Sequence, residues 1–303
     1  MRSSLSLQVQ TSLLNISRAT DGLMEAQTRA STGKRILKAS DDVPGTDRAL
    51  SLRSAINTVD QLADNSVVSK PALQTADTAL DSITKAINSV QSIAIGAANA
   101  SVTDAVRQDY LKQLDGIMTD LADMANTRHM DQYVFSGTAT GTPSVTAQAG
   151  SPPYLYSGDS GIRKAQVLSW VSVPTNIPGD KLFNFDGSAG VGTTDLFTMV
   201  ADVREAIASE DNTELSSQLN NINANLDNVL SCRSRIGSWV RRIESAQDVL
   251  AESKTRMQEL LSNEEDADLP AAIIQLQTQQ NVYQAALAVS SKILELSLAS
   301  LQR

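Results

Sequence analysis

Both ends of the chain carry apolar stripes that recur at alternating steps of three and four residues over about 30 positions. The stripe at the start runs through Leu5, Val9, Ile16 and Leu23, and the one at the finish runs through Ile273, Leu276, Tyr283, Leu287, Leu294, Leu298 and Leu301. Stripes this narrow are typical of helices that pack on another helix. Because such helices gain most of their stability from whatever covers the apolar face, we predict that helices 5–32 and 268–302 pair with each other and then with neighbouring subunits.

The composition favours a helical bundle and disfavours an enzyme. Only 4% of the 303 residues are aromatic whereas 41% are hydrophobic, so the core is expected to be aliphatic and deep ligand pockets are not. A formal charge of −9 opposes binding to nucleic acid or to an anionic membrane. No apolar run reaches about 18 residues, so no membrane span is expected, and the first residues do not read as a cleaved leader.

The middle of the chain has a different composition from its ends. Nine of the 15 glycines lie between Gly137 and Gly192, and eight of the 11 aromatic residues lie between Tyr133 and Phe197. Short apolar runs there alternate with turn residues, which indicates short strands. We therefore predict a mainly α protein: an elongated helical bundle or coiled coil formed by both chain ends (1–136 plus 195–303), with a small inserted β-rich domain at 137–194.

Several helix boundaries can be predicted from single residues. Long three-four patterns predict helices at about 73–94, 104–128 and 212–261. Pro71 is expected to kink or divide the helix that arrives from about residue 46, and Asn212 is expected to cap the third of these helices. The acidic run Glu264, Glu265, Asp266 and Asp268, followed by Pro270, is expected to provide the caps at the entry of the last helix.

The segment STGKRILKASDDVPG, at 31–45, connects the first two predicted helices. Gly33 can end the first helix, Asp41 or Asp42 can cap the second, and Pro44 suits its first turn. An ordinary connector would explain these roles. The combination with the pattern at the opposite end of the chain is more specific.

These two ends resemble the bacterial flagellins and their hook-associated relatives. The resemblance at the start rests on Gly33, Arg35, Ile36, Asp41, Asp42 and Gly45, and that at the finish rests on EDADLPAAIIQLQTQQNVYQAALAVSSKILELSL with Asp266 and Asp268. The segments YVFSG at 133–137 and YSGDSGIR at 156–163 are similar to members that join the flagellar hook to the filament. Two departures are Ala30 before Ser31, and Val43 between Asp42 and Pro44.

The resemblance implies a structural subunit that joins the hook to the filament and assembles through its terminal helices. The implied partners are other copies of the chain, a hook-associated protein on the hook side, flagellin on the filament side and a cytoplasmic export chaperone. It also implies type III export without a cleaved signal peptide and an extracellular location in the flagellum. No nucleic acid, membrane, cofactor or catalysis is expected.

Two other functions fit parts of the sequence, namely a flagellin-type filament subunit and a soluble coiled-coil signalling or scaffold protein. An enzyme sited in the insert is disfavoured because residues 137–195 contain no His, Cys or Glu. The single histidine, His129, has no nearby partners for catalysis or metal binding. The single cysteine, Cys232, is expected to pack in a helix, and residues 264–268 lack the ligand spacing of a calcium loop. We therefore predict no catalytic, cofactor or metal site.

Overall fold

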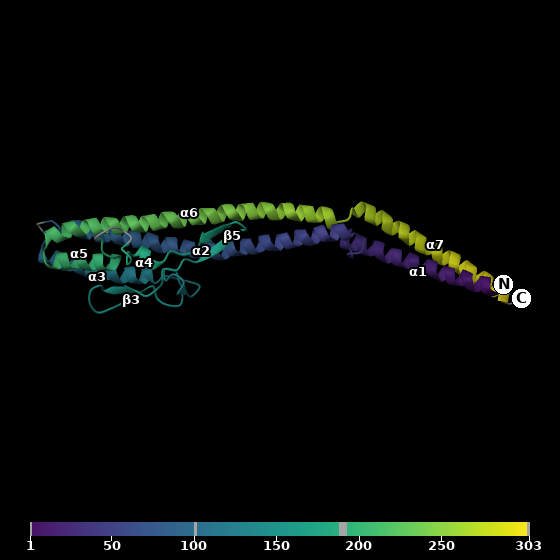
Figure 1. Cartoon of the computed structure of the whole chain (residues 1–303), viewed down its shortest axis with the longest axis horizontal. Coiled ribbons are helices and arrows are strands. Elements are labelled where there is room, and N and C mark those ends of the chain that lie inside the picture. The colour runs from purple at the N-terminus through teal and green to yellow at the C-terminus, as the bar shows by residue number, and fades with distance from the viewer. Residues whose placement is uncertain (1, 100–101, 188–192, 302–303) are drawn as a thin grey trace. The chain divides into compact units, whose positions relative to one another are not determined.

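The computed structural model describes residues 2–99, 102–187 and 193–301, and most of these are helical (Figure 1). The predicted mainly α fold with long terminal helices and a small strand-bearing insert is confirmed. The elements in chain order are α1 (Arg2–Thr32), α2 (Val43–Ala97), α3 (Asp104–Ala125), β1 (Arg128–His129), β2 (Gln132–Tyr133), β3 (Val145–Ala147), β4 (Tyr154–Tyr156), β5 (Lys164–Leu168), β6 (Val171–Pro174), α4 (Gly179–Leu182), α5 (Leu196–Ala208), α6 (Asn212–Glu265) and α7 (Leu269–Leu301).

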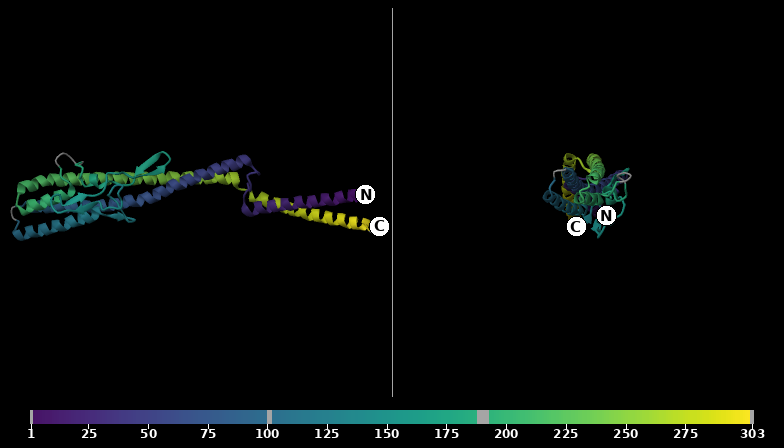
Figure 2. Two further views of the ribbon diagram at one scale, coloured as in Figure 1. Left: turned by 60° about the horizontal axis from the view of Figure 1, so that its bottom comes forward. Right: turned by 90° about the vertical axis from the view of Figure 1, so that its left-hand side faces the viewer.

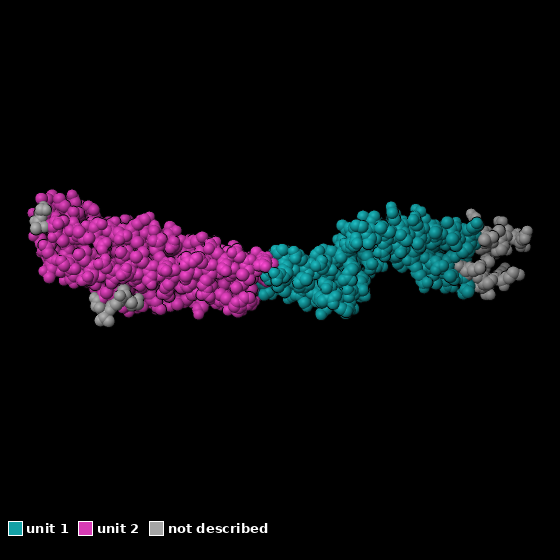
Figure 3. Space-filling model, turned by 90° about the horizontal axis from the view of Figure 1, so that it is seen from above, with its two compact units in different colours: residues 1–58, 253–303 teal, residues 59–252 magenta. Residues whose placement is uncertain are grey.

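The chain forms two compact units, coloured separately in Figure 3. Unit 1 holds residues 1–58 and 253–303, and unit 2 holds residues 59–252. Unit 1 therefore contains α1 and α7 with the start of α2 and the end of α6. Unit 2 contains the remaining helices and every strand of the described chain.

Unit 2 is a bundle in which α2, α3, α5 and α6 share one aliphatic core. Leu80 and Ile87 of α2, Leu114 of α3, Val203 of α5 and Ile236 of α6 are all fully buried in it. These positions follow the three-four spacing that predicted the helices. Among the described residues, no helix is long and apolar enough to cross a membrane.

The strands form three separate antiparallel pairs, β1–β2, β3–β4 and β5–β6. Tyr154 of β4 lies 4.9 Å from Phe197 of α5 between ring centroids. Phe183 joins the same cluster of rings, at 5.7 Å from Phe197 and 5.9 Å from Phe135. Edge and tilted ring contacts of this kind stabilise a small core beyond the area that they bury. Residues 137–194 therefore share a core with the helices, and the pair β1–β2 precedes the predicted insert.

Pro71 does not divide the helix, because α2 continues through it from Val43 to Ala97. The other predicted effect, a kink, stays a prediction. A proline inside a helix removes one backbone hydrogen bond. On either side of it α2 is held by tertiary contacts, since Lys70 pairs with Glu244 of α6 at 2.8 Å and Leu73 is fully buried in the core. This packing outweighs the missing bond and holds the helix in one piece.

Two predicted caps are also corrected. Asp211, rather than Asn212, caps α6, because its Oδ1 accepts the backbone N–H groups of Thr213 and Glu214 at 2.9 and 3.0 Å. In the acidic run only Asp268 acts as a cap, since its Oδ1 accepts from the N–H of Ala271 at 3.3 Å. α6 reaches Glu265, so the acidic side chains before Asp268 face a different set of partners.

Candidate assembly site

In unit 1 the first and last helices lie side by side, antiparallel, in both views of the ribbon (Figures 1 and 2). The line of contact on α1 consists of two rows of residues spaced seven apart. One row is Val9, Ile16 and Leu23, and the other includes the buried Ala19 and Ala26. We name this contact between α1 and α7 the terminal seam. A Cβ on Gly22 would lie 3.1 Å from Oε1 of Gln279, which shows how closely the two helices approach.

The seam on α7 passes mainly through small or polar residues. Ala272 and Ser290 are buried, and Leu276, Gln279, Tyr283, Ala286 and Ile293 are half-buried. Of the residues predicted from the sequence, Leu276 and Tyr283 lie on this line. Ile273 and Leu287 lie one residue beyond it and are 53% and 42% exposed. The side chains of Leu5, Leu294, Leu298 and Leu301 lie outside the described residues.

The terminal pair leaves large apolar side chains uncovered. Leu13, Leu14 and Met24 of α1 are exposed, as are Ile273, Ile274, Val282, Leu287 and Val289 of α7. Exposed apolar residues in such numbers mark a surface that another protein covers. The seam therefore accounts for only part of the apolar surface of the two helices.

Beyond the helix pair, the two chain segments that lead away from it run together as a short ladder. The segments are 33–45 and 264–268, and we name them the connectors. Lys34 and Asp266 form an antiparallel β-bridge. The N–H of Arg35 donates to the carbonyl of Glu265 at 2.6 Å, and the N–H of Ala267 donates to the carbonyl of Gly33 at 2.8 Å.

Charged side chains join the connectors to the neighbouring helices, with Glu265 at the centre. The residue is 5% exposed, and its carboxylate accepts hydrogen bonds from Nζ of Lys34 at 3.3 Å and from Nη2 of Arg53 at 2.7 Å. The carboxylate of Glu264 accepts hydrogen bonds from both Nε and Nη2 of Arg48, at 2.9 and 3.0 Å. Such bidentate pairs fix geometry as well as charge. Lys34 also donates to Oδ1 of Asp266 at 2.7 Å.

The predicted motif residues act within these connectors. Gly33 has a φ of +66° and ends α1, as predicted. Asp42 caps α2 by accepting the N–H of Gly45 at 2.9 Å, and Asp41 accepts the N–H groups of Leu37 and Lys38. Any Cβ on Gly45 would lie 2.3 Å from Oδ2 of Asp42 and 2.9 Å from Cδ1 of Ile36. A side chain at position 45 is thus incompatible with this cap.

The carboxyl pKa values in the connectors are lowered by these partners. Hydrogen bonds from the backbone of Gly45 and from Arg35 lower the pKa of Asp42, and the hydrogen bond from Arg48 lowers that of Glu264. The pKa of Asp266 is lowered by the side chains of Lys34 and Ser262. Each partner donates to the ionised form and so favours it.

Sequence reasoning missed Lys34, Arg48, Arg53, Glu264 and Glu265 as members of this site. None of them belongs to an apolar stripe, and the acidic run was interpreted as caps. A usable signal was present, because the basic residues of 34–53 and the acidic residues of 264–266 are complementary in sign.

The residues that were predicted to have no catalytic role lie in structural positions. Nδ1 of His129 lies 3.2 Å from Oγ1 of Thr75, and Cys232 is buried, which raises the pKa of its thiol. A buried thiol of raised pKa is a poor nucleophile. Within the described ranges, no group of three or more His, Cys, Asp or Glu residues is placed to hold a metal ion.

The family follows from comparison with known proteins. Residues 3–140 match the family model of the bacterial flagellin N-terminal helical region, and residues 211–301 match that of the bacterial flagellin C-terminal helical region. The chain belongs to the bacterial flagellin family. Both connectors lie inside the matched ranges, and the unmatched residues 141–210 hold most of the strand-bearing insert.

Similar members of this flagellin family include both junction and filament proteins. Flagellar hook-associated protein 3 of Escherichia coli K12 is 27% identical over the whole of both chains. A flagellin of Listeria monocytogenes is 25% identical over 90% of this chain and 88% of its own. A solved structure of a putative flagellar hook-associated protein from Vibrio parahaemolyticus has a TM-score of 0.67 at 21% identity, and covers 75% of this chain and 100% of its own.

Proposed function

We propose that this chain is a structural subunit of the bacterial flagellum that joins the hook to the filament and has no catalytic role. The observation that supports the role best is the match to hook-associated protein 3 over the full length of both chains. The flagellin of Listeria monocytogenes, by comparison, matches over 90% of this chain. The chain would contact other copies of itself, a hook-associated protein on one side and flagellin on the other.

The terminal helices supply the physical basis for assembly. The buried residues of their seam are Ala19, Ala26, Ala272 and Ser290, which bury little apolar area. The larger side chains on the seam, such as Leu23, Leu276 and Tyr283, are only half-buried, so the pair gains only part of the available stability from its own contact. The exposed Leu, Ile, Val and Met side chains on the same two helices gain far more when a neighbouring copy covers them. Assembly is therefore the step that buries this surface.

The proposal extends to the route by which the chain reaches its site. We propose export through the flagellar type III channel, with a cytoplasmic chaperone covering the exposed apolar face of α7 beforehand. The exposed Ile273, Ile274 and Val289 would otherwise promote aggregation. Binding of the purified chaperone from the same flagellar system, lost on replacing these residues by Ser, would support this step.

A filament subunit is the second candidate, and it is favoured by the flagellin relatives that match most of the chain. Purified protein added to isolated hooks separates the two functions. Electron microscopy should show growth that stops after a short layer, to which flagellin then adds. Long homopolymers would instead identify a filament subunit, and no binding to hooks would contradict both.

A further inference from the structure

A band of arginines on α6 is the exception to the acidic charge of unit 2. Residues 59–252 contain 23 acidic and 13 basic side chains. Four of the basic ones, all arginines, fall within residues 229–243, where no acidic residue occurs. We give the name arginine face to the exposed members of this band, which are Arg235, Arg241 and Arg242. Positive charge is thus gathered at one place on a unit that is otherwise rich in carboxylates.

The charge of the arginine face is not neutralised by the chain itself. None of its three guanidinium groups forms an ion pair with a residue that the structure describes, whereas Arg233 of the same helix pairs with Asp77 and Asp81 of α2 at 3.3 and 3.0 Å. The guanidinium of Arg235 lies over the ring of Trp239, 5.7 Å from its centroid, which favours this position. Arginine and tryptophan are the residues that most often dominate contacts between proteins. The face therefore suits an acidic protein partner.

Small residues lie between these arginines. Seven positions separate Arg235 from Arg242, so both project from the same side of α6, and Ser238 lies between them. A Cβ on Gly237 would lie 3.6 Å from Nη1 of Arg241, which is an ordinary contact, so the described chain does not require a glycine there. Glycine destabilises the middle of a helix relative to alanine. The bare backbone beside Arg241 suits a close approach from outside.

The carboxylates of unit 2 are most concentrated where α5 leads into α6. Residues 195–214 contain six acidic side chains and one basic one, Arg204, which pairs with Asp115 of α3 at 2.6 Å. We give the name acidic corner to the exposed carboxylates of this stretch, which are Glu205, Glu210, Asp211 and Glu214. The corner thus presents four negative charges against the three positive charges of the arginine face.

Like charges lie close together at this corner. The pKa of Asp202 is raised, first by burial and then by the charges of Glu214, Asp195 and Glu205. Glu205 and Glu214 form no ion pair within the described ranges. Cations brought by another molecule would relieve the repulsion between these carboxylates.

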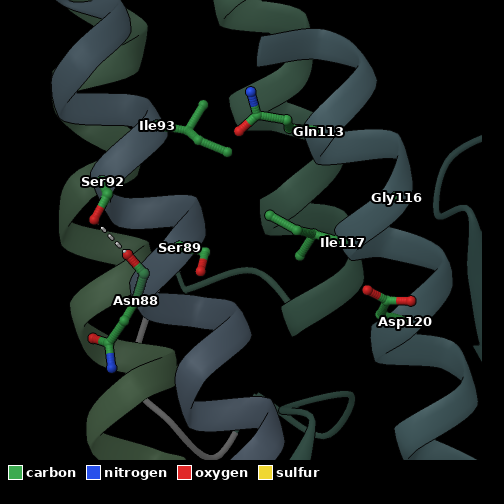
Figure 4. Close-up of a pocket in the computed structure, with 8 residues that line it drawn as sticks. All are labelled: Asn88, Ser89, Ser92, Ile93, Gln113, Gly116, Ile117 and Asp120. Atoms are coloured by element: carbon green, nitrogen blue, oxygen red, sulfur yellow. Dashed lines mark hydrogen bonds between the residues drawn. The ribbon is translucent and has the colours of Figure 1, made fainter. Parts of the chain in front are cut away.

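The groove between α2 and α3 does not offer the same complement to the arginines. It has a volume of about 540 Å³, and among the residues that line it only Asp120 is charged (Figure 4). Ser89, Ser92 and Gln113 provide uncharged polar groups there. A single carboxylate does not match three arginines, whereas the acidic corner does.

The arginine face and the acidic corner do not meet within one chain. Glu214 and Arg235 lie 21 positions apart on the same helix, which at about 1.5 Å per residue separates them by roughly 30 Å. A contact between the two surfaces therefore needs two molecules. A second copy of the chain supplies the missing surface, because every copy carries both.

We propose that the arginine face of one copy binds the acidic corner of a second copy. This inference rests on the proposed function and deepens it by naming a contact between subunits. Complementary charge favours the encounter of the two surfaces and fixes their register. Because the contact joins two different surfaces, it can repeat from copy to copy.

Charge reversal in the full-length chain tests the pairing. One variant carries Arg235→Glu and Arg242→Glu, and the other carries Glu205→Lys and Glu214→Lys. Sedimentation at low ionic strength should show self-association weakened about tenfold or more in each variant alone, because like charges then face each other. Mixing the two variants should restore association, since every contact between unlike variants again joins opposite charges. Failure of the mixture to recover would overturn the pairing.

A matched control separates this pairing from a general effect of net charge. Lys85→Glu with Lys112→Glu changes the net charge as much as the arginine reversals do, at two side chains that are 77% exposed and belong to neither surface. This variant should keep most of the association of the wild type. An equal loss in the control would show that total charge acts, and would overturn the contact.

Disulfide formation between single-cysteine chains tests the geometry without changing a charge. Cys232→Ala removes the native thiol, after which Ser238→Cys places a thiol on the arginine face and Thr213→Cys places one at the acidic corner. With diamide as oxidant, a mixture of the two chains should give a dimer that contains one of each, and either chain alone should give little. Equal dimer formation by each chain alone, or none in the mixture, would overturn the contact.

The outcome is separable from that of the proposed function. Charge-reversed chains that bind hooks and associate normally would overturn this contact and leave the junction role intact. A wild-type chain that remains monomeric at low ionic strength, or an arginine face that only flagellin protects from labelling, would also overturn binding of a second copy. Failure of the wild-type chain to bind hooks would count against the junction role alone.

Discussion

Lys34 and Asp266, 232 positions apart in the sequence, form both a β-bridge and an ion pair in which Nζ lies 2.7 Å from Oδ1. This contact ties the end of the first helix to the start of the last. Both segments belong to unit 1. The contact therefore fixes the point where the chain leaves α1 next to the point where it enters α7. The motif residues near the start of the chain and those near its end are thereby brought next to each other.

Removing the cations around Glu265 should destabilise the chain more than removing the carboxylate. Lys34→Met with Arg53→Met leaves a buried charge without a partner, at a cost of about 3 kcal/mol. Glu265→Gln leaves two cations whose side chains are 40% and 57% exposed and can be hydrated, at a cost of about 1 kcal/mol. Urea unfolding followed by circular dichroism measures both, and equal losses would contradict a central role for Glu265.

Gly45→Ala should destabilise the chain although alanine favours helices. The new Cβ would lie 2.3 Å from Oδ2 of Asp42, so the cap of α2 must open, at a cost of about 1–2 kcal/mol. Gly116→Ala is the matched control and should stabilise by about 0.5–1 kcal/mol, because its Cβ has free space. Thermal unfolding of the two variants should shift in opposite directions. A shift in the same direction would disprove the close approach at Gly45.

Periodicity was enough to predict the helices and some of the residues that line the terminal seam, but not all of them. The sequence-based stripe on α7 followed the largest apolar residues, including Ile273 and Leu287. The observed contact keeps Leu276 and Tyr283 of that stripe but passes through Ala272, Ala286 and Ser290 rather than Ile273 and Leu287, because closely packed helices place small side chains between their backbones. The choice between neighbouring stripes depends on the partner helix, which periodicity alone does not contain.

Local signals predicted the backbone of the connectors, whereas the ion pairs depend on tertiary structure. Gly33 and Asp42 act within a few residues of their own position, so their roles could be inferred from the sequence. Glu264 and Glu265 bind side chains more than 200 positions away. Pro71 does not break α2 for a similar reason, since the tertiary contacts of the residues beside it decide its effect.

The connectors should loosen in acid. The folded-state pKa values of Asp42, Glu264 and Asp266 are lowered, so the stability that they contribute is present above their unfolded values of about 4 and is lost as pH falls through the folded values. Unfolding midpoints in urea should therefore fall between pH 5 and pH 3. In a chain carrying Glu264→Gln and Asp266→Asn the decrease should be smaller, and an unchanged pH profile would exclude these groups as its source.

Substitutions at exposed positions of the terminal helices should impair assembly, whereas a substitution at a buried position should impair folding. Ile273→Asp with Leu287→Asp alters exposed side chains, so the stability of the monomer should change by no more than about 0.5 kcal/mol. If neighbouring copies bury both residues, the loss of about 3 kcal/mol or more weakens incorporation into hooks more than a hundredfold. Ala26→Asp, at a position that is 2% exposed, should instead separate α1 from α7 and lower the helical signal in circular dichroism. Normal incorporation of the double variant would show that this face of α7 stays uncovered in the assembly, and that the apolar contact between subunits lies elsewhere on the pair.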